Sequence, residues 1–414
     1  MRKTFILSFF LLFTINIFAQ DVVRTMFYNL WDFPSARIQN REVILKRIVD
    51  QIDPDILMVS ELESEAGAEL ILNSLNSTGN SYAMAPFIPS ASGDFDHQQL
   101  IYFKRKKFNL EYSEAIPTAV RDINYYDLKM NTADAATDPI HLHVFVTHLK
   151  SSQGPANRQA RLEMVEAFIA KTETLDPTSF VLFSGDFNLY NFSEPAYQRM
   201  IDPTNNIPLE DPAQREGNWH ENRNFMDVHT QSTRISSTGF GGGAGAGMDD
   251  RFDFIMMSSN IRTNEKLKYV PNSYLSFGNN GNCYKKSIND PECDGFYNQE
   301  TRDDLYWMSD HLPVVMEMTT NKTILNTENF TFESAQPFKL RSSLVRENLQ
   351  ISVNMNFSQT LRFTIYNVLG QKILESSTHK IDEIAIDVSS LSNGIYYIKS
   401  NIPNTPTLKF LKSS

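Results

Sequence analysis

Cysteine and positive charge are both scarce in this chain of 414 residues. Two cysteines are too few for a disulfide-rich scaffold or a thiolate zinc site. The chain has 38 Lys and Arg against 49 Asp and Glu, a formal net charge of -11, which argues against a protein that coats polyanions through general basicity. Any nucleic-acid binding would have to use a local basic or metal-bearing surface.

Long hydrophobic runs are confined to the N-terminus. Arg2 and Lys3 precede a short apolar stretch, and Ala19 follows it. This pattern predicts a cleaved secretory signal over residues 1–20, with an N-terminal anchor helix as the alternative. No later segment is long and apolar enough to cross a membrane, so we predict no transmembrane segment in the mature chain. Length and a hydrophobic content of 41% indicate one large domain and a smaller one.

Two short segments have unusual composition. Cys283 and Cys293 are an isolated close pair, which in an exported protein predicts one disulfide closing a surface loop, with free thiols as the alternative. Residues 239–247 contain six glycines and predict a mobile loop, without the Lys-Ser/Thr of a phosphate cradle. The aromatic insert 271–307 could form a wall of a cleft or pack its own aromatics together.

Strand-like and helix-like segments alternate along the first three quarters of the chain, which indicates an α/β architecture. The expected strands include residues 22–28, 56–59, 100–103, 140–149 and 180–183, and the expected helices are 36–52, 65–75 and 157–175.

Polar residues suited to metal or phosphate chemistry stand at the ends or starts of six expected strands. A turn would explain one such ending, but six in order predict an active site. They are Asn29, Glu61, Thr147-His148-Leu149, Ser184-Gly185-Asp186-Phe187-Asn188, Arg251-Phe252-Asp253 and Ser309-Asp310-His311.

This set resembles the endonuclease/exonuclease/phosphatase superfamily, typified by pancreatic-type DNase and abasic-site endonucleases, over residues 22–319. The resemblance implies a four-layer α/β sandwich, in which two mixed β-sheets pack face to face, helices cover both outer sides and the site lies along one edge. It also implies a metal-dependent phosphodiesterase, foremost a nuclease acting on DNA or RNA.

Phosphodiester cleavage needs a divalent cation, an oriented water and donors to the phosphate oxygens. Glu61 is the expected hard-oxygen ligand, because Mg²⁺ prefers carboxylates, water and phosphate oxygens. The resemblance places Asn29 and Asp310 at the same metal, as ligands or their neighbours. The expected cation is Mg²⁺, with Mn²⁺ or Ca²⁺ as alternatives.

The resemblance also assigns catalytic roles. Asp186 would orient or deprotonate the attacking water, and Asn188 would hold that water or the phosphate. His311 would face the scissile phosphate, with Asp253 fixing its tautomer. His148 would contact the phosphate or act as general acid.

Other polar residues are weaker candidates. Arg121, Arg158 and Arg161 could bind phosphate, although solvated arginines are common. His97, His141 and His143 match no family position and are expected to be structural.

Beyond residue 320 the chain changes character. Residues 321–337 are polar and predict a linker, and residues 338–414 contain short alternating strands that predict a small all-β sandwich. Ile365-Tyr366-Asn367-Val368-Leu369-Gly370, Gly394-Ile395-Tyr396-Tyr397 and the basic end at Lys409 resemble the C-terminal sorting domain of the type IX secretion system. That resemblance implies recognition by the secretion machinery and removal of this domain. A retained surface-binding module is the alternative.

The expected organisation is therefore a signal peptide (1–20), a catalytic domain (21–320), a linker (321–337) and a sorting domain (338–414). We predict a secreted or cell-surface monomer that hydrolyses nucleic acid. Two alternatives keep the fold: a hydrolase of a phospholipid (sphingomyelinase-like) or of another small phosphoester, and a secreted binding protein without catalysis.

Overall fold

The computed structural model divides the chain into two compact units, residues 1–326 and 327–414. The expected signal peptide and the linker residues 326–337 lie outside the residues that it describes. The division falls within the segment expected to be a linker. The described residues are 21–79, 81–92, 97–325, 338–341, 344–353, 360–368, 370–378, 383–401 and 407–413.

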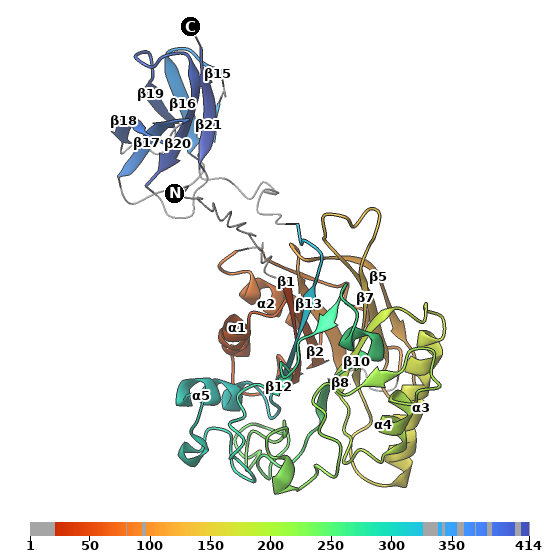
Figure 1. Cartoon of the computed structure of the whole chain (residues 1–414). Helices are drawn as coiled ribbons and strands as arrows, with labels where there is room; N and C mark the ends of the chain where they lie inside the picture. The colour runs from red at the N-terminus through yellow and green to blue at the C-terminus, as the bar shows by residue number, and fades with distance from the viewer. Residues whose placement is uncertain are drawn as a thin grey trace, which may run out of the picture. The chain divides into compact units, whose positions relative to one another are not determined.

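Two mixed β-sheets form the centre of the first unit (Figure 1). One has the order β11-β13-β1-β2-β4-β3, with β12 also paired to β13, and the other has the order β5-β6-β7-β8-β10-β9. The strands of the first sheet are β1 (Asp21–Phe33), β2 (Ile56–Leu62), β3 (Tyr82–Met84), β4 (Gln98–Lys104), β11 (Lys268–Tyr269), β12 (Leu275–Ser276) and β13 (Val314–Thr320). Those of the second are β5 (Phe108–Ile116), β6 (Ile123–Met130), β7 (His141–His148), β8 (Phe180–Asp186), β9 (Leu209–Glu210) and β10 (Asp253–Ser258).

Helices cover the outer face of each sheet (Figure 1). The first sheet packs against α1 (Arg41–Ile52), α2 (Glu65–Leu75) and α5 (Gln299–Met308), and the second against α3 (Pro155–Thr172) and α4 (Pro195–Met200). Apolar residues on α1 recur at helical spacing from Ile44 to Ile52, so one face of this helix is buried. The expected helix 36–52 begins later, at Arg41.

The side chains of β8 show why the layers stack as they do. Leu182 points inward and joins the core between the two sheets. Val181 and Phe183 belong to the outer core with α3, where the rings of Phe183 and Phe168 stack with centroids 4.0 Å apart. Because successive strand residues point to opposite faces, a strand buried on both sides is a continuous apolar run. The predicted four-layer α/β sandwich is confirmed.

The sheet topology gathers the polar strand ends at one edge. β1 and β2 are parallel, as are β7 and β8, so each pair ends at the same edge. β13 runs antiparallel to β1, and β10 antiparallel to β8, so both begin where their partners end. In the second sheet Asp186 lies opposite both His148 and Asp253 in register.

The second unit contains two small sheets around one apolar core. The expected strand-rich C-terminal region is present. Strands β18, β14, β15 and β21 were not expected from the sequence. The sheet orders are β14-β16-β19 and β15-β21-β20-β17-β18. The strands are β14 (Phe338–Leu340), β15 (Leu344–Val345), β16 (Asn348–Val353), β17 (Leu361–Asn367), β18 (Lys372–Thr378), β19 (Glu383–Asp387), β20 (Gly394–Ser400) and β21 (Leu408–Lys412).

The aromatic insert before β13 contains structure of its own. Cys283 and Cys293 form a disulfide there, as predicted. Helix α5, which the sequence analysis did not predict, follows and buries Leu305 and Met308 against the first sheet. Among the described residues, none of the helices has the length and apolar character needed to span a bilayer.

Candidate active site

Asn29 joins the two sheets at their common edge. Its amide nitrogen donates to Glu61 Oε1 of the first sheet (2.9 Å) and to Asp186 Oδ2 of the second (3.1 Å). Its Oδ1 accepts from the backbone N–H of Trp31 (2.9 Å), so the nitrogen must face the two carboxylates. The fully buried amide thus holds one carboxylate from each sheet in a fixed position.

His311 lies near the amide nitrogen of Asn29 and is held by Asp253. Its Nδ1 lies 2.8 Å from Asp253 Oδ2. A carboxylate only accepts, so Nδ1 carries the proton and Nε2 faces the site. Nε2 lies 2.6 Å from the amide nitrogen of Gln231, 3.5 Å from that of Asn29 and 3.7 Å from Asp186 Oδ2. The buried Asp–His pair therefore aims one ring nitrogen at the group around Asp186.

His148 approaches the same carboxylates from β7. Its Nε2 lies 3.4 Å from Asp186 Oδ2, and its Nδ1 lies 3.7 Å from Glu61 Oε1. Gly185 permits this closeness of β7 and β8, because a Cβ atom there would lie 2.1 Å from the carbonyl oxygen of Thr147. No other residue type fits at this position without separating the strands that carry His148 and Asp186.

Three residues at the site have a left-handed backbone: Asp32 (φ 43°), Glu61 (φ 54°) and Asn188 (φ 50°). Such strain costs about 1–3 kcal/mol per residue and gathers at functional sites. The N–H of Asn188 donates to Asp186 Oδ1 (3.1 Å), so the turn that strains Asn188 also fixes Asp186.

Burial and mutual repulsion shift the acid–base properties of this group. Burial, followed by the charge of Asp310, raises the pKa of Glu61. Burial, with Asp253 and Glu61, raises the pKa of Asp186 to about 8. Burial lowers the pKa of His148, and Arg121 and His97 lower it further. Burial also acts to lower the pKa of His311, but Asp253 and Asp186 outweigh it and raise that pKa well above the ordinary value.

Asp310 completes the set of eight predicted residues that the structure brings to this edge. Its Oδ2 accepts from the N–H of Ala244 (2.5 Å), and its Oδ1 is buried without a hydrogen-bond partner. Ala244 belongs to the glycine-rich segment 239–247, which rests on the site: a Cβ at Gly243 would lie 3.0 Å from Trp31 and 3.1 Å from Asp310.

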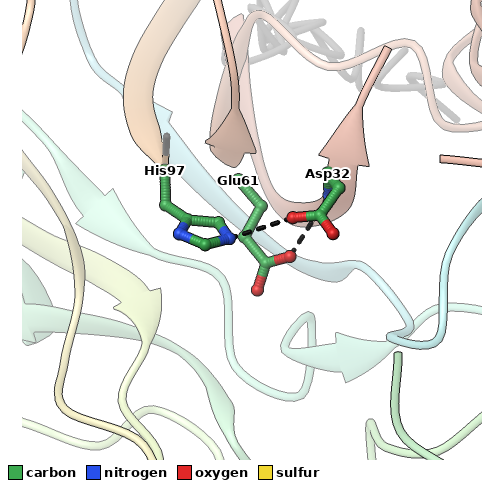
Figure 2. Close-up of side chains that lie close together, drawn as sticks. All are labelled: Asp32, Glu61 and His97. Carbon is green, nitrogen blue, oxygen red and sulfur yellow. Dashed lines mark hydrogen bonds and ion pairs between the residues drawn. The ribbon is translucent and has the colours of Figure 1, made fainter. Parts of the chain in front are cut away.

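The carboxylates and histidines fit a divalent cation. Two groups of side chains have ligand atoms that all lie within 4.8 Å of one another: Asp32 with Glu61 and His97, and Glu61 with His148 and Asp186. Figure 2 shows Asp32, Glu61 and His97 directed toward one another, with His97 Nε2 2.9 Å from Asp32 Oδ1. The pKa values of Glu61 and Asp186 are raised, and the Oδ1 atom of Asp310 has no hydrogen-bond partner. A bound cation would stabilise the charged carboxylates and would give this oxygen a partner.

Two predicted phosphate-binding residues lie apart from this centre. Arg121 is buried, and its Nη1 donates to the carbonyls of His148 (3.5 Å) and Leu149 (3.3 Å), so it supports the end of β7 from behind. Arg158 is exposed on the first turn of α3. Arg161, the third arginine considered, is buried in an ion pair with Glu194 (2.7 Å).

The sequence analysis missed several residues of the site. Asp32 was hidden because the expected strand stopped at residue 28, whereas β1 continues to Phe33. His97 was set aside as structural, but it faces Asp32 and Glu61. Thr230 accepts from the N–H groups of Phe252 and Asp253, and Gln231 contacts His311. Both lie in an irregular segment without periodic signal.

Comparisons with known proteins give solved structures of similar fold and one family model. No curated protein matches the chain. An endonuclease/exonuclease/phosphatase family protein from Bacteroides thetaiotaomicron is 13% identical, covers 73% of this chain and 100% of its own, and has a TM-score of 0.47. TDP2 of D. rerio, complexed with a single-strand DNA product, is 15% identical, with coverages of 72% and 99% and a TM-score of 0.48.

The human Nocturnin catalytic domain with bound sulfate is also similar, at 15% identity, coverages of 73% and 98%, and a TM-score of 0.44. The C-terminal unit matches a family model directly. Residues 345–411 match the secretion system C-terminal sorting domain, which indicates that the protein is exported.

Proposed function

We propose that residues 21–325 hydrolyse phosphodiester bonds, foremost those of nucleic acid. The observation that carries the proposal is the buried Asp253–His311 pair aimed at Asp186, with Asn29 tying Asp186 to Glu61 across the two sheets. This arrangement provides an imidazole ring held in one orientation, a buried carboxylate held for a water molecule and a second, mostly buried carboxylate for a cation.

Each side chain has a defined part in the proposal. The raised pKa of His311 favours its imidazolium form, which donates through Nε2 to the phosphate oxygens while Asp253 holds the ring through Nδ1. Asp186 orients the attacking water, with Asn188 beside it. His148 contacts the phosphate or the leaving oxygen. Glu61, Asp310, Asp32 and His97 would hold a divalent cation, and Asn29 orients Glu61. When bound, the cation would neutralise charge on the phosphate.

The test is hydrolysis of plasmid DNA and of RNA by the purified full chain, with Mg²⁺ or Mn²⁺ and then with EDTA. We expect cleavage that EDTA abolishes. Absence of metal-dependent cleavage of either nucleic acid, and of small phosphodiesters, would contradict the proposal and leave a secreted binding protein on this fold.

A phospholipid substrate is the second candidate, favoured by one observation. Phe296 is 91% exposed beside Tyr297, three residues after the disulfide-bonded Cys293. A large exposed aromatic can enter a lipid surface. Cosedimentation with sphingomyelin vesicles separates the candidates: binding lost in Phe296→Ser would favour the lipid, and no binding would favour nucleic acid.

A further inference from the structure

A cavity of about 230 Å³ lies beside the site but takes no part in the chemistry proposed above. Its walls come from the loop after β7, the loop after β8, the start of α3 and a further segment around Asn218. The lining residues are Gln153, Gly154, Arg158, Arg161, Tyr190, Asn191, Glu194, Asn218 and His220. The first two loops begin directly after His148 and Asp186, which are the last residues of β7 and β8. The cavity is therefore close in sequence to the centre.

The floor of the cavity is rigid and its charges cancel. Arg161 and Glu194 are buried as an ion pair, and the remaining donors of Arg161 reach the carbonyls of Lys150 (2.8 Å) and Ser152 (2.9 Å). Glu194 also accepts from the N–H of Tyr190 (2.9 Å). The pair therefore ties the loop after β7 to the loop after β8 and has no charge left for a ligand.

The rim offers donors and one uncompensated positive charge. Arg158 is exposed and pairs with no carboxylate in the part of the chain that the structure describes. It lies on the first turn of α3, which carries no acidic residue, so the positive end of the helix adds to its field. Asn191 and Asn218 add amide groups to the lining.

His220 and Tyr190 form the remaining wall. His220 Nδ1 lies 2.5 Å from Asp250 Oδ1, so Nδ1 carries the proton, and Nε2 lies 3.0 Å from the amide nitrogen of Gln153. The ring of His220 meets that of Tyr190 edge-on, with centroids 4.8 Å apart. Burial, Asp250 and Asp186 raise the pKa of Tyr190 to about 12, so its hydroxyl stays a neutral donor near the centre.

We propose that this cavity is a substrate subsite that binds a phosphate group of the same nucleic-acid strand, one position away from the phosphate being cleaved. The ligand is anionic because Arg158 leaves the rim positive and the lining is rich in N–H and O–H donors. It is a single group because the cavity is smaller than the roughly 300–1,000 Å³ that holds a drug-sized ligand. This inference rests on the proposed function, since it needs a polymeric substrate at the neighbouring centre.

The test compares Arg158→Gln with Lys106→Gln in the full chain. Each change removes one exposed positive charge. Lys106 lies just after the C-terminal end of β4, whereas His97 lies just before the N-terminal end of this strand. Binding of an end-labelled single-stranded oligonucleotide is measured by fluorescence anisotropy in EDTA at several salt concentrations. For Arg158→Gln we expect about tenfold weaker binding, the order of one charged hydrogen bond, and a salt slope reduced by about 0.7. Lys106→Gln should leave both values unchanged.

Two further measurements show whether the cavity is responsible. Asn218→Trp, at an exposed rim position, should fill the cavity and weaken oligonucleotide binding without removing charge. Hydrolysis of bis(4-nitrophenyl) phosphate, which has a single phosphate group and cannot occupy the centre and the cavity at once, should stay within twofold of wild type in all variants. Equal losses on both substrates, equal losses in Arg158→Gln and Lys106→Gln, or an unchanged salt slope in Arg158→Gln would each overturn the subsite.

The experiments can contradict the proposed function and the proposed subsite independently of each other. A wild-type chain that hydrolyses neither substrate contradicts the proposed function. The anisotropy data in EDTA still decide the subsite in that case, because they need no turnover.

Discussion

The two units of the chain bury different kinds of side chain. The first unit buries charged residues at its strand ends, including Asp186, Asp253, Asp310 and His311. In the described part of the second unit, Lys412 is the only polar or charged residue that is buried. The described part of the second unit thus holds no cluster of buried charges, and burying several charged groups together opposes folding. The proposed function would explain why they are concentrated at one edge of the first unit.

Among variants that test this difference between the two units, we expect the largest effect from Gly185→Ala, on the stability of the first unit. The new Cβ would meet a backbone oxygen of β7, which side-chain rotation cannot relieve. We expect a loss of unfolding free energy at or above the roughly 1–3 kcal/mol typical of overpacked cores. All three tryptophans (31, 219 and 307) lie in the first unit, so tryptophan fluorescence during denaturation reports this unit alone.

Gly370→Ala is the matched change in the second unit. Gly370 has φ +74° and nothing within 4 Å of an added Cβ, so only backbone strain of about 1–2 kcal/mol arises. The fluorescence transition should not move in this variant. A Gly185→Ala protein that unfolds at the wild-type denaturant concentration would refute the packing argument for this edge.

Glu61→Gln should reduce phosphodiester hydrolysis at least a hundredfold, because it removes a carboxylate charge that would hold the cation. The fold should be kept, since glutamine has the same shape and burial of Glu61 already favours its neutral form. Glu375→Gln, at a surface ion pair with Lys372 in the second unit, is the control and should leave turnover unchanged. Near-normal turnover by Glu61→Gln would remove Glu61 from the cation site.

Ile365→Val should affect the second unit alone. Ile365 is fully buried in its apolar core, and loss of one methylene typically costs about 0.5–1.5 kcal/mol. Hydrogen–deuterium exchange of residues 361–367 should accelerate, while hydrolysis and tryptophan fluorescence stay as in wild type. A shift of the fluorescence transition would show that the two units unfold together.

The smallest expected effect is on how the stability of the first unit depends on pH. The hydrogen bond to Asp250 raises the pKa of His220 above the ordinary value of about 6.5. A raised pKa in the folded state stabilises the fold below the ordinary value, and this contribution is lost as pH rises through the folded pKa. His220→Gln should therefore cost more at pH 5 than at pH 9, by less than about 1 kcal/mol.

Fluorescence-monitored denaturation at the two pH values measures this difference. Of the eight histidines, only His379 belongs to the second unit, and it lies outside the described residues. An equal cost of His220→Gln at both pH values would mean that the His220–Asp250 pair does not stabilise the fold.

Much of the fold was predictable, because buried strands leave a strong local signal. Residues 180–183 are apolar on both faces and form the first four residues of β8. The strands of the second unit with clear alternation, such as 361–366, were predicted, whereas the exposed β18 was not. Helix α5 was missed because its sequence, QETRDDLYWM, is mostly polar and its apolar contacts come from tertiary packing.

The candidate site was predictable only where it coincides with strand ends. Asn29, Glu61, His148 and Asp186 follow apolar runs, so topology places them together. Predicting that Asp32 and His97 lie at the site requires the exact end of β1 and the exact start of β4. Such boundaries are the weakest part of sequence analysis. The cavity beside α3 could not be foreseen, because most of its lining comes from loops.

The Asn29 amide binds one carboxylate from each sheet, so the centre forms only when both sheets have come together. Strands β1 and β2 supply Asn29 and Glu61 early, but Asp186 and His311 emerge from the ribosome much later. A growing or unfolded chain on its way out of the cell therefore holds no assembled centre. Under the proposed function, the producing cell's own nucleic acids are safe until the last strand of the first unit has joined its sheet.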